Sequence, residues 1–203
     1  MKSLIRLLLL LLLLSNPTLA MAERTLLVIG DSLSSAYNMP LAVGWVALLK
    51  TKVAPAVRVI NGSTSGDTTA QGLTKMPGLL ERYRPEIVII ELGANDGLRG
   101  HPPFAIQKNL EAMVRAARAR GARVLLLGMD IPANYGDAYR TAVRRVYAAV
   151  AKNTNVTLLP FLLEGIASQP SLMQPDRLHP NAAAQPLILE KVWAALQPLL
   201  KEH

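Results

Sequence analysis

The chain has 203 residues, 51% of them hydrophobic and 18% charged, which is enough for one domain with a single buried core. Its formal net charge is +8, but no basic block is interleaved with aromatic residues, so we interpret the charge as favouring solubility rather than binding to nucleic acid or anionic lipid. The absence of cysteine excludes disulfides, thiolate catalysis, cysteine metal ligands and lipid attachment at an N-terminal cysteine.

Residues 1–22 have the pattern of a secretory signal peptide. Lys2 and Arg6 provide a positive start, residues 7–14 are an unbroken leucine run, and Ala20-Met21-Ala22 fits an A-x-A cleavage site. The run is too short to cross a bilayer about 30 Å thick as a helix, and an uncleaved anchor is the alternative. We therefore expect a periplasmic protein without a stable membrane anchor, whose mature domain covers residues 23–203.

Five short apolar runs follow, each nearly continuous rather than alternating. They cover residues 26–29, 57–61, 87–92, 124–127 and 156–159. This pattern is typical of parallel strands that are buried on both faces.

Longer amphipathic stretches separate these runs and predict helices over residues 42–52, 68–82, 104–120, 137–153 and 182–200. Gly121 marks the end of the third stretch, and Pro77-Gly78 predicts a break in the second. Basic residues in these stretches are expected to lie on solvated faces, among them Arg115, Arg118, Arg120, Arg140, Arg144 and Arg145.

The repeated alternation of strand and helix predicts a three-layer α/β sandwich around a five-stranded parallel sheet. In such sheets, ligands bind outside the carboxyl ends of the strands. Ser32, Gly66 and Asn95 follow the first, second and third predicted strands, so we expect them to meet at one edge of the sheet.

Each polar segment has an ordinary structural interpretation when it is taken alone. Gly30-Asp31-Ser32 is typical of a turn, residues 65–67 and 95–97 are typical of loops, and Asp176 with His179 is typical of a surface ion pair. Together they supply what acyl transfer needs, which is a nucleophile, a base, a group that orients the base, and donors for the oxyanion.

Ser32 is the candidate nucleophile and His179 the candidate base. His203 is the last residue, and His101 lies in a Gly-His-Pro-Pro loop without a carboxylate nearby in the sequence. Asp176, three residues before His179, can accept from the imidazole and fix the tautomer that presents its other nitrogen to Ser32. The candidate oxyanion donors are the backbone N–H groups of Ser32 and Gly66 and the Asn95 side-chain amide.

The order Ser, Asp, His is shared with the α/β-hydrolases, but their G-x-S-x-G elbow is missing around Ser32. The segments instead resemble the four blocks of the SGNH (GDSL) hydrolase family, within it the bacterial periplasmic thioesterase, protease, lysophospholipase and arylesterase type. The segments that carry this resemblance are Gly30-Asp31-Ser32-Leu33-Ser34, Ser65-Gly66-Asp67-Thr68, Gly93-Ala94-Asn95-Asp96, Asn95-Asp96-Gly97-Leu98-Arg99-Gly100, Pro132-Ala133-Asn134-Tyr135-Gly136 and Asp176-Arg177-Leu178-His179-Pro180.

The resemblance covers essentially the whole mature chain and implies a flavodoxin-like sheet order. It implies Ser32, Asp176 and His179 as the catalytic triad, Ser32, Gly66 and Asn95 as oxyanion donors, and no metal or cofactor. In relatives, the segment at 97–104 is a mobile loop over the acyl groove, and His101-Pro102-Pro103 is expected to stiffen it here. Asp130 and Ile131 are expected to help line that groove.

The sequence therefore predicts a monomeric serine esterase of broad specificity. Its expected substrates are small molecules, namely aryl and acyl esters, acyl thioesters and lysophospholipids, and no nucleic-acid partner is expected. Two alternatives are a carbohydrate deacetylase of the same fold and a non-catalytic flavodoxin-like binding domain, although the latter lacks a glycine-rich phosphate loop.

Overall fold

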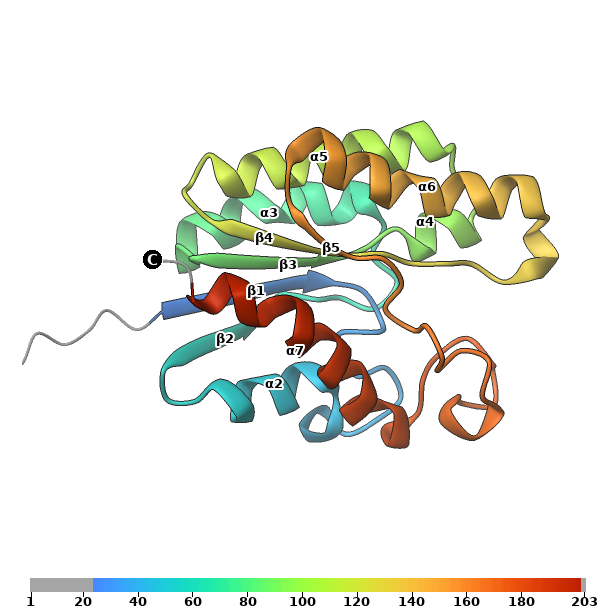
Figure 1. Cartoon of the computed structure of the whole chain (residues 1–203), viewed down its shortest axis with the longest axis horizontal. Helices are drawn as coiled ribbons and strands as arrows, with labels where there is room; N and C mark the ends of the chain where they lie inside the picture. Colours follow the sequence, from blue (N-terminus) through green and yellow to red (C-terminus); the bar gives the residue numbers. More distant parts are fainter. Residues whose placement is uncertain (1–23, 202–203) are drawn as a thin grey trace, which may run out of the picture.

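A five-stranded parallel sheet forms the centre of the protein in the computed structural model, which describes residues 24–201 (Figure 1). The strands are β1 (Arg24–Gly30), β2 (Val57–Asn61), β3 (Ile87–Glu91), β4 (Arg123–Leu127) and β5 (Thr157–Leu159). Their order is β2-β1-β3-β4-β5, and all neighbours are parallel. This is the flavodoxin-like order, so the predicted sheet is confirmed. The predicted signal peptide lies outside the described residues.

Helices cover both faces of this sheet, which confirms the predicted three layers (Figure 1). On one face lie α3 (Thr69–Tyr83), α5 (Pro103–Arg118) and α6 (Asp137–Thr154), with α5 packed between the other two. On the other face, α2 (Trp45–Val53) packs against α7 (Gln185–Lys201). Buried aliphatic side chains fill the space between the layers, together with the large side chains of Trp45 and Tyr147.

The inner strands are buried on both faces, but the two edge strands are not. All five residues of β3 and four of the five of β4 are buried, whereas β2 alternates and all three residues of β5 are only half-buried. An edge strand has a neighbour on one side only, so its outer positions reach solvent. The predicted burial on both faces is therefore wrong for β2 and β5.

The predicted break at Pro77-Gly78 is also wrong, because α3 runs through both residues without interruption. Pro77 lies on the exposed side, where water can bond to the carbonyl that loses its partner. Met76 and Leu80 are buried beneath the helix. Their burial contributes roughly 1.5–3 kcal/mol each, which offsets the cost of about 3 kcal/mol for an internal proline.

Local signals set the ends of two helices. Thr68 caps α3, because its side chain accepts from the Gln71 N–H while the Gln71 side chain accepts from the Thr68 N–H. Beyond α5, Gly121 has a φ of +80°, and the Ala122 N–H returns to the Ala117 carbonyl. The predicted end of this helix before Gly121 is confirmed.

Several short helical segments differ from the predicted elements, including 3-10 turns at Ala133–Tyr135 and Pro170–Leu172. The helices predicted from residues 42 and 182 begin instead with 3-10 turns at Leu41–Val43 and Ala182–Ala184. A helix that was not predicted, α4 (Ala94–Leu98), follows β3 immediately. It carries Asn95, and it therefore sets the direction of that side chain at the edge of the sheet.

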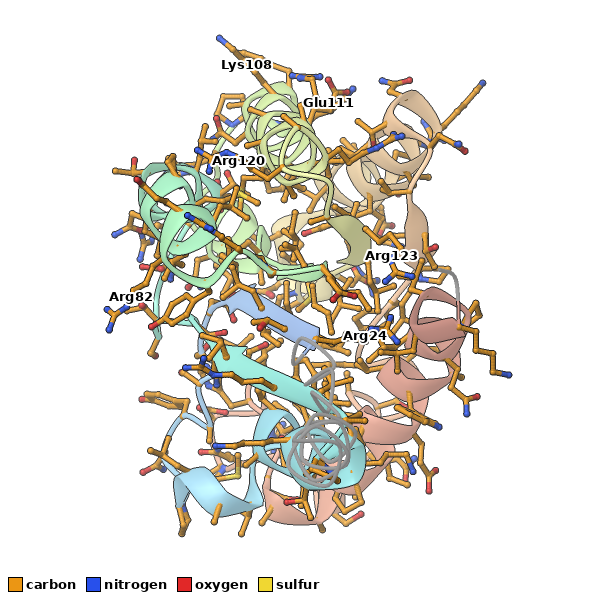
Figure 2. The ribbon with its side chains drawn as sticks, turned by 90° about the vertical axis from the view of Figure 1, so that its left-hand side faces the viewer. Arg24, Arg82, Lys108, Glu111, Arg120 and Arg123 are labelled. Carbon is orange, nitrogen blue, oxygen red and sulfur yellow. The ribbon has the colours of Figure 1, made fainter. Side chains whose placement is uncertain are left out.

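Many of the basic side chains extend into solvent, as expected for a charge that favours solubility. Figure 2 shows Arg82 and Lys108 pointing outward, whereas Arg24 lies against the sheet and donates to Glu86 at 2.9 Å. The expectation is wrong for Arg140, which is half-buried and forms a two-contact ion pair with Asp130. Arg118 is exposed as expected, although it also donates to the Thr154 carbonyl. Among residues 24–201, no helix is long and apolar enough to cross a membrane.

Candidate active site

The predicted site residues meet at the carboxyl edge of the sheet. Ser32 lies two residues beyond β1, Gly66 lies in the loop after β2, and Asn95 lies in α4 after β3. The Asn95 amide nitrogen donates to the Asp31 carboxylate at 2.9 Å and to the Asp67 carbonyl at 3.1 Å. These contacts tie the three loops together, because parallel strands end at the same edge.

Ser32, His179 and Asp176 form a continuous chain of hydrogen-bonded side chains. Ser32 Oγ lies 2.9 Å from His179 Nε2, and His179 Nδ1 lies 2.7 Å from Asp176 Oδ2. The second contact requires the proton on Nδ1 whenever Asp176 is ionised, which leaves the Nε2 lone pair facing the serine hydroxyl. The geometry is that of a hydroxyl beside a base whose tautomer is fixed by a carboxylate.

Backbone groups of the turn at 176–179 hold the Asp176 carboxylate in its orientation toward the imidazole. Asp176 Oδ1 accepts from the backbone N–H groups of Leu178 and His179 at 2.9 and 3.0 Å. Burial alone would raise the pKa of Asp176, but these two N–H groups and the His179 ring lower it to about 2. The carboxylate is therefore ionised, as a group that orients histidine must be.

Two backbone donors near Ser32 are free to bind an anion. Within residues 24–201, neither the N–H of Ser32 nor that of Gly66 has an acceptor. Gly66 has a φ of +83°, a left-handed conformation that favours glycine. The third candidate donor differs, since both hydrogens of the Asn95 amide nitrogen already have acceptors and an oxyanion would share one of them.

A carboxyl pair that sequence reasoning did not identify lies beneath the nucleophile. Glu91, the last residue of β3, is fully buried, and its Oε2 accepts from the Asp31 N–H at 3.2 Å and the Ser34 hydroxyl at 2.7 Å. A Cβ on Gly30 would lie 2.6 Å from this oxygen and 2.7 Å from Ser34 Oγ. Glycine at position 30 therefore makes room for the side chain of Glu91.

Both members of this pair have a raised pKa. Burial raises the pKa of Asp31 to about 6, although hydrogen bonds from the Leu33 N–H and the Glu91 side chain oppose it. Burial and then the charge of Asp31 raise the pKa of Glu91 well above its usual range. The apolar run of β3 gave no signal for this role, because a glutamate at a strand end is ordinarily exposed.

Two further residues that were not predicted contact the histidine loop. The ring of Tyr37 lies 4.4 Å from the imidazole of His179, measured between centroids. The buried Gln174 donates to the Tyr37 and Pro180 carbonyls at 3.0 and 3.1 Å, so it joins the nucleophile loop to the histidine loop. Gln174 and Tyr37 are 137 residues apart in the sequence, so only the folded chain brings them together.

The environment of His101 differs from the one expected. His101 does have a carboxylate nearby, because its Nδ1 lies 3.6 Å from Oδ1 of the buried Asp96. Asp96 is five residues earlier, and the turn after α4 folds the chain back on itself. Tyr139 donates to the His101 carbonyl at 2.7 Å and Tyr135 to the Leu98 carbonyl at 3.0 Å, which adds two contacts to the 97–104 segment.

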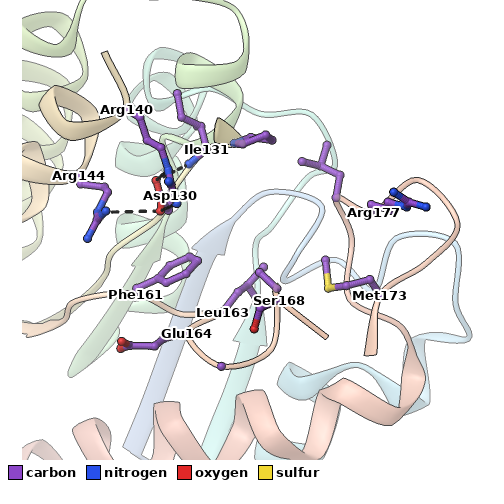
Figure 3. A pocket seen from close by; sticks show the side chains of 14 residues that line it. Asp130, Ile131, Arg140, Arg144, Phe161, Leu163, Glu164, Ser168, Met173 and Arg177 are labelled. Carbon is purple, nitrogen blue, oxygen red and sulfur yellow. Dashed lines mark hydrogen bonds and ion pairs between the residues drawn. The ribbon is translucent and has the colours of Figure 1, made fainter. Parts of the chain in front are cut away.

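One cavity borders Ser32, and a larger one adjoins it. The smaller, about 80 Å³, is bordered by Ser32 and His179 and has mainly apolar walls such as Leu98 and Met129. The larger, about 520 Å³, shares Asp130, Leu163 and Leu178 with it and is seen in Figure 3. Asp130 and Ile131 both border this larger cleft, and Figure 3 shows Asp130 joined to Arg140 and Arg144.

Within the described residues, no group of three or more histidine, cysteine, aspartate or glutamate side chains is arranged to hold a metal ion. The groups around Ser32 are those of a proton-transfer chain, a set of backbone and side-chain amide donors, and an apolar pocket.

Comparison with known proteins places these features in a family. The model of the GDSL-like lipase/acylhydrolase family matches residues 28–186. The chain is 51% identical over 182 residues to esterase TesA of Pseudomonas aeruginosa, a match that covers 88% of this chain and 90% of that protein. It is 43% identical to thioesterase 1/protease 1/lysophospholipase L1 of Escherichia coli over 181 residues, which cover 89% and 87% of the two chains.

A third relative, the arylesterase of Vibrio mimicus, is 44% identical over 191 residues, or 93% of this chain and 96% of that one. Among solved structures, the crystal structure of TesA aligns with a TM-score of 0.84 at 51% identity, covering 87% of this chain and 99% of that chain.

Proposed function

The chain belongs to the GDSL-like lipase/acylhydrolase family, and on this premise we propose that Ser32 is its nucleophile, His179 its general base and Asp176 the residue that orients His179. The chain is an ester and thioester hydrolase of broad specificity, like the relatives named esterase, thioesterase and arylesterase. One observation supports the assignment most directly. Ser32 Oγ, His179 and Asp176 are joined by contacts of 2.9 and 2.7 Å, with the histidine tautomer fixed.

The proposed reaction proceeds through an acyl-enzyme. Ser32 Oγ attacks the substrate carbonyl while His179 Nε2 takes its proton, and the N–H groups of Ser32 and Gly66 and the Asn95 amide bind the oxyanion. His179 then protonates the leaving alcohol or thiol as the carbonyl re-forms. Water, deprotonated by His179, attacks the acyl-enzyme, and the collapse of the second tetrahedral intermediate returns the proton to Ser32.

The cavities support small acyl and aryl substrates. A pocket of about 80 Å³ with apolar walls suits a short acyl or aryl group next to Ser32, and the open cleft of about 520 Å³ beyond it can take a longer chain or a leaving group. We propose aryl esters, short-to-medium acyl esters, acyl thioesters and lysophospholipids as substrates.

We propose that the protein acts in the periplasm as a monomer after removal of residues 1–22. The charged start, leucine run and A-x-A site support export. Export would separate the enzyme from cytoplasmic coenzyme A thioesters, so its natural substrate would lie outside the inner membrane. Intact-mass analysis of the exported protein tests the cleavage, and a chain that still begins at Met1 would contradict it.

The deacetylase alternative receives no support from the relatives described above, which are esterases and thioesterases. The binding-domain alternative is likewise set aside, because the family consists of acylhydrolases. A series of p-nitrophenyl esters of increasing acyl length, assayed beside acyl thioesters and an acetylated sugar, separates the substrate classes.

A fluorophosphonate probe tests the nucleophile itself. We expect it to label the wild-type protein at Ser32 and to leave the Ser32→Ala variant unlabelled, because only an activated serine reacts. Labelling of the variant, or a wild-type protein that hydrolyses esters but is never labelled at Ser32, would contradict the assignment.

A further inference from the structure

One carboxyl oxygen of Glu91 accepts hydrogen bonds, and the other is buried without a hydrogen-bond donor. Its Oε2 accepts from the Asp31 N–H and from the Ser34 hydroxyl. Its Oε1 is buried and receives no donor from any residue between 24 and 201. An ionised carboxylate would leave this oxygen desolvated without compensation, whereas a protonated one turns it into a donor.

The acceptor available for that proton is the side chain of Asp31, whose own N–H contacts the other carboxyl oxygen of Glu91 at 3.2 Å. The remaining contacts of Asp31 are all with donors, since Oδ1 accepts from the Leu33 N–H at 3.0 Å and Oδ2 from the Asn95 amide at 2.9 Å. Two adjacent buried carboxyl groups do not both ionise, so the pair keeps one proton.

The direction of the pKa shifts agrees with this distribution of the proton. The pKa of Glu91 is raised well above its usual range, and that of Asp31 to about 6. The titratable groups facing the pair are His179, whose charge lowers the pKa of Asp31, and Tyr147, whose own pKa is raised by burial and then by the charge of Glu91. Both directions favour a proton on Glu91 over one on Asp31.

We propose that Glu91 is a positioning residue for the oxyanion site: as a neutral acid it donates to the Asp31 carboxylate, and through Asp31 it holds the Asn95 amide in place beside Ser32. The inference rests on the proposed function, in which Asn95 donates to the oxyanion. The proton also limits the charge of the pair to −1, which reduces repulsion of the oxyanion that forms next to it.

Two substitutions separate a neutral acid from an ionised one. The amide in Glu91→Gln can accept through its oxygen and donate to Asp31 through its nitrogen, as the protonated acid does, so we expect kcat within about threefold of wild type. Glu91→Leu removes both functions, and we expect kcat to fall on the order of tenfold or more with KM within about twofold. If Glu91→Gln loses as much activity as Glu91→Leu, the proposal is wrong.

A double-substitution experiment tests the path through Asn95. In an Asn95→Ala background, Glu91→Leu is expected to lower kcat by less than about threefold, because the group that it positions is already gone. An equal loss from Glu91→Leu in both backgrounds would show that Glu91 acts independently of Asn95, which contradicts the proposal.

Infrared spectroscopy detects the protonated form of Glu91 directly, which a purely structural role of the side chain does not require. At neutral pH the wild-type protein is expected to show the C=O stretch of a protonated carboxylic acid, shifted in D₂O and missing from Glu91→Gln. Its absence from the wild-type protein, or its persistence in Glu91→Gln, would overturn the proposal. This measurement and the Glu91→Gln assay still decide the matter if Glu91→Leu does not fold.

Labelling by the fluorophosphonate probe distinguishes a failure of the Ser32 assignment from a failure of the Glu91 proposal. A wild-type protein that is not labelled at Ser32 contradicts the proposed function, whatever the infrared spectrum shows. A wild-type protein that is labelled, with Glu91→Leu labelled just as fast, contradicts only the role of Glu91.

Discussion

The ring of Tyr37 lies over the imidazole of His179, with their centroids 4.4 Å apart and their planes inclined by 35°. Tyr37 follows Ser32 in the loop after β1, and its N–H donates to the Ser32 carbonyl at 3.2 Å. The same loop therefore supplies the hydroxyl at one side of the histidine and an aromatic surface at another.

We expect Tyr37→Ala to lower kcat/KM about threefold to tenfold, because an aromatic pair contributes roughly 0.5–1.5 kcal/mol beyond its buried area. Steady-state hydrolysis of a p-nitrophenyl ester measures the loss. Tyr37→Phe keeps the ring and serves as the matched control, with activity close to wild type. Equal losses in the two variants would mean that the hydroxyl, rather than the ring, supports His179.

Asn95→Ala should fold normally and lose roughly 10²–10³ in kcat, the usual cost of removing one oxyanion donor. Circular dichroism and steady-state kinetics measure the two properties. Asn134→Ala, at an exposed position on a 3-10 turn, is the control and should be nearly silent. If the kcat of Asn95→Ala is unchanged, the assignment of this residue to the oxyanion site is wrong.

The stability of the protein should depend on Asp176 at low pH. Its pKa is lowered from 3.8 to about 2 in the folded protein, so the ionised form stabilises the fold fully above pH 4 and this contribution is lost as the pH falls through about 2. We expect Asp176→Asn to melt below wild type at neutral pH and the difference to shrink toward pH 2.

Thermal unfolding of both proteins across this pH range checks the prediction. Glu190→Gln, an exposed change on α7, controls for the loss of a negative charge. A difference in Tm that stays constant from neutral pH to pH 2 would argue against the shifted pKa of Asp176.

Gln174→Ala should lower both stability and kcat, since Gln174 links the loops of Ser32 and His179. Its loss leaves the carbonyls of Tyr37 and Pro180 without their donor, at an expected cost of about 2–3 kcal/mol in the free energy of unfolding. Chemical denaturation measures this cost. Gln197→Ala on the exposed side of α7 should change neither property, and a silent Gln174→Ala would mean that the two loops are held by other contacts.

Ser32 and His179 should behave as one catalytic unit. Ser32→Ala and His179→Ala are each expected to remove nearly all activity, and the double variant should be little worse than Ser32→Ala alone. Rates from high enzyme concentrations, corrected for background hydrolysis, make the comparison. A double variant whose loss equals the product of the single losses would show that the two side chains act independently.

Much of this site is local in the sequence and could be predicted from it. Asp176 and His179 lie three residues apart in a turn whose own backbone donors hold the carboxylate, so their pairing needs no distant element. Ser32, Gly66 and Asn95 each follow a strand, and a parallel sheet brings such positions to the same edge. The continuous apolar runs also predicted the three inner strands correctly, because a strand that is buried on both faces is apolar at nearly every position.

Tertiary structure decided everything that depends on distant partners. Met76 and Leu80 keep α3 intact through Pro77, since their burial in the core offsets the local preference of proline. Glu91 and Gln174 look like ordinary polar residues in the sequence, and only the packing of β3 beneath the Ser32 loop and of the histidine loop against it makes them buried partners. A short sequence window records local turns and periodicity, whereas burial and long-range hydrogen bonds arise only when the layers of the fold assemble.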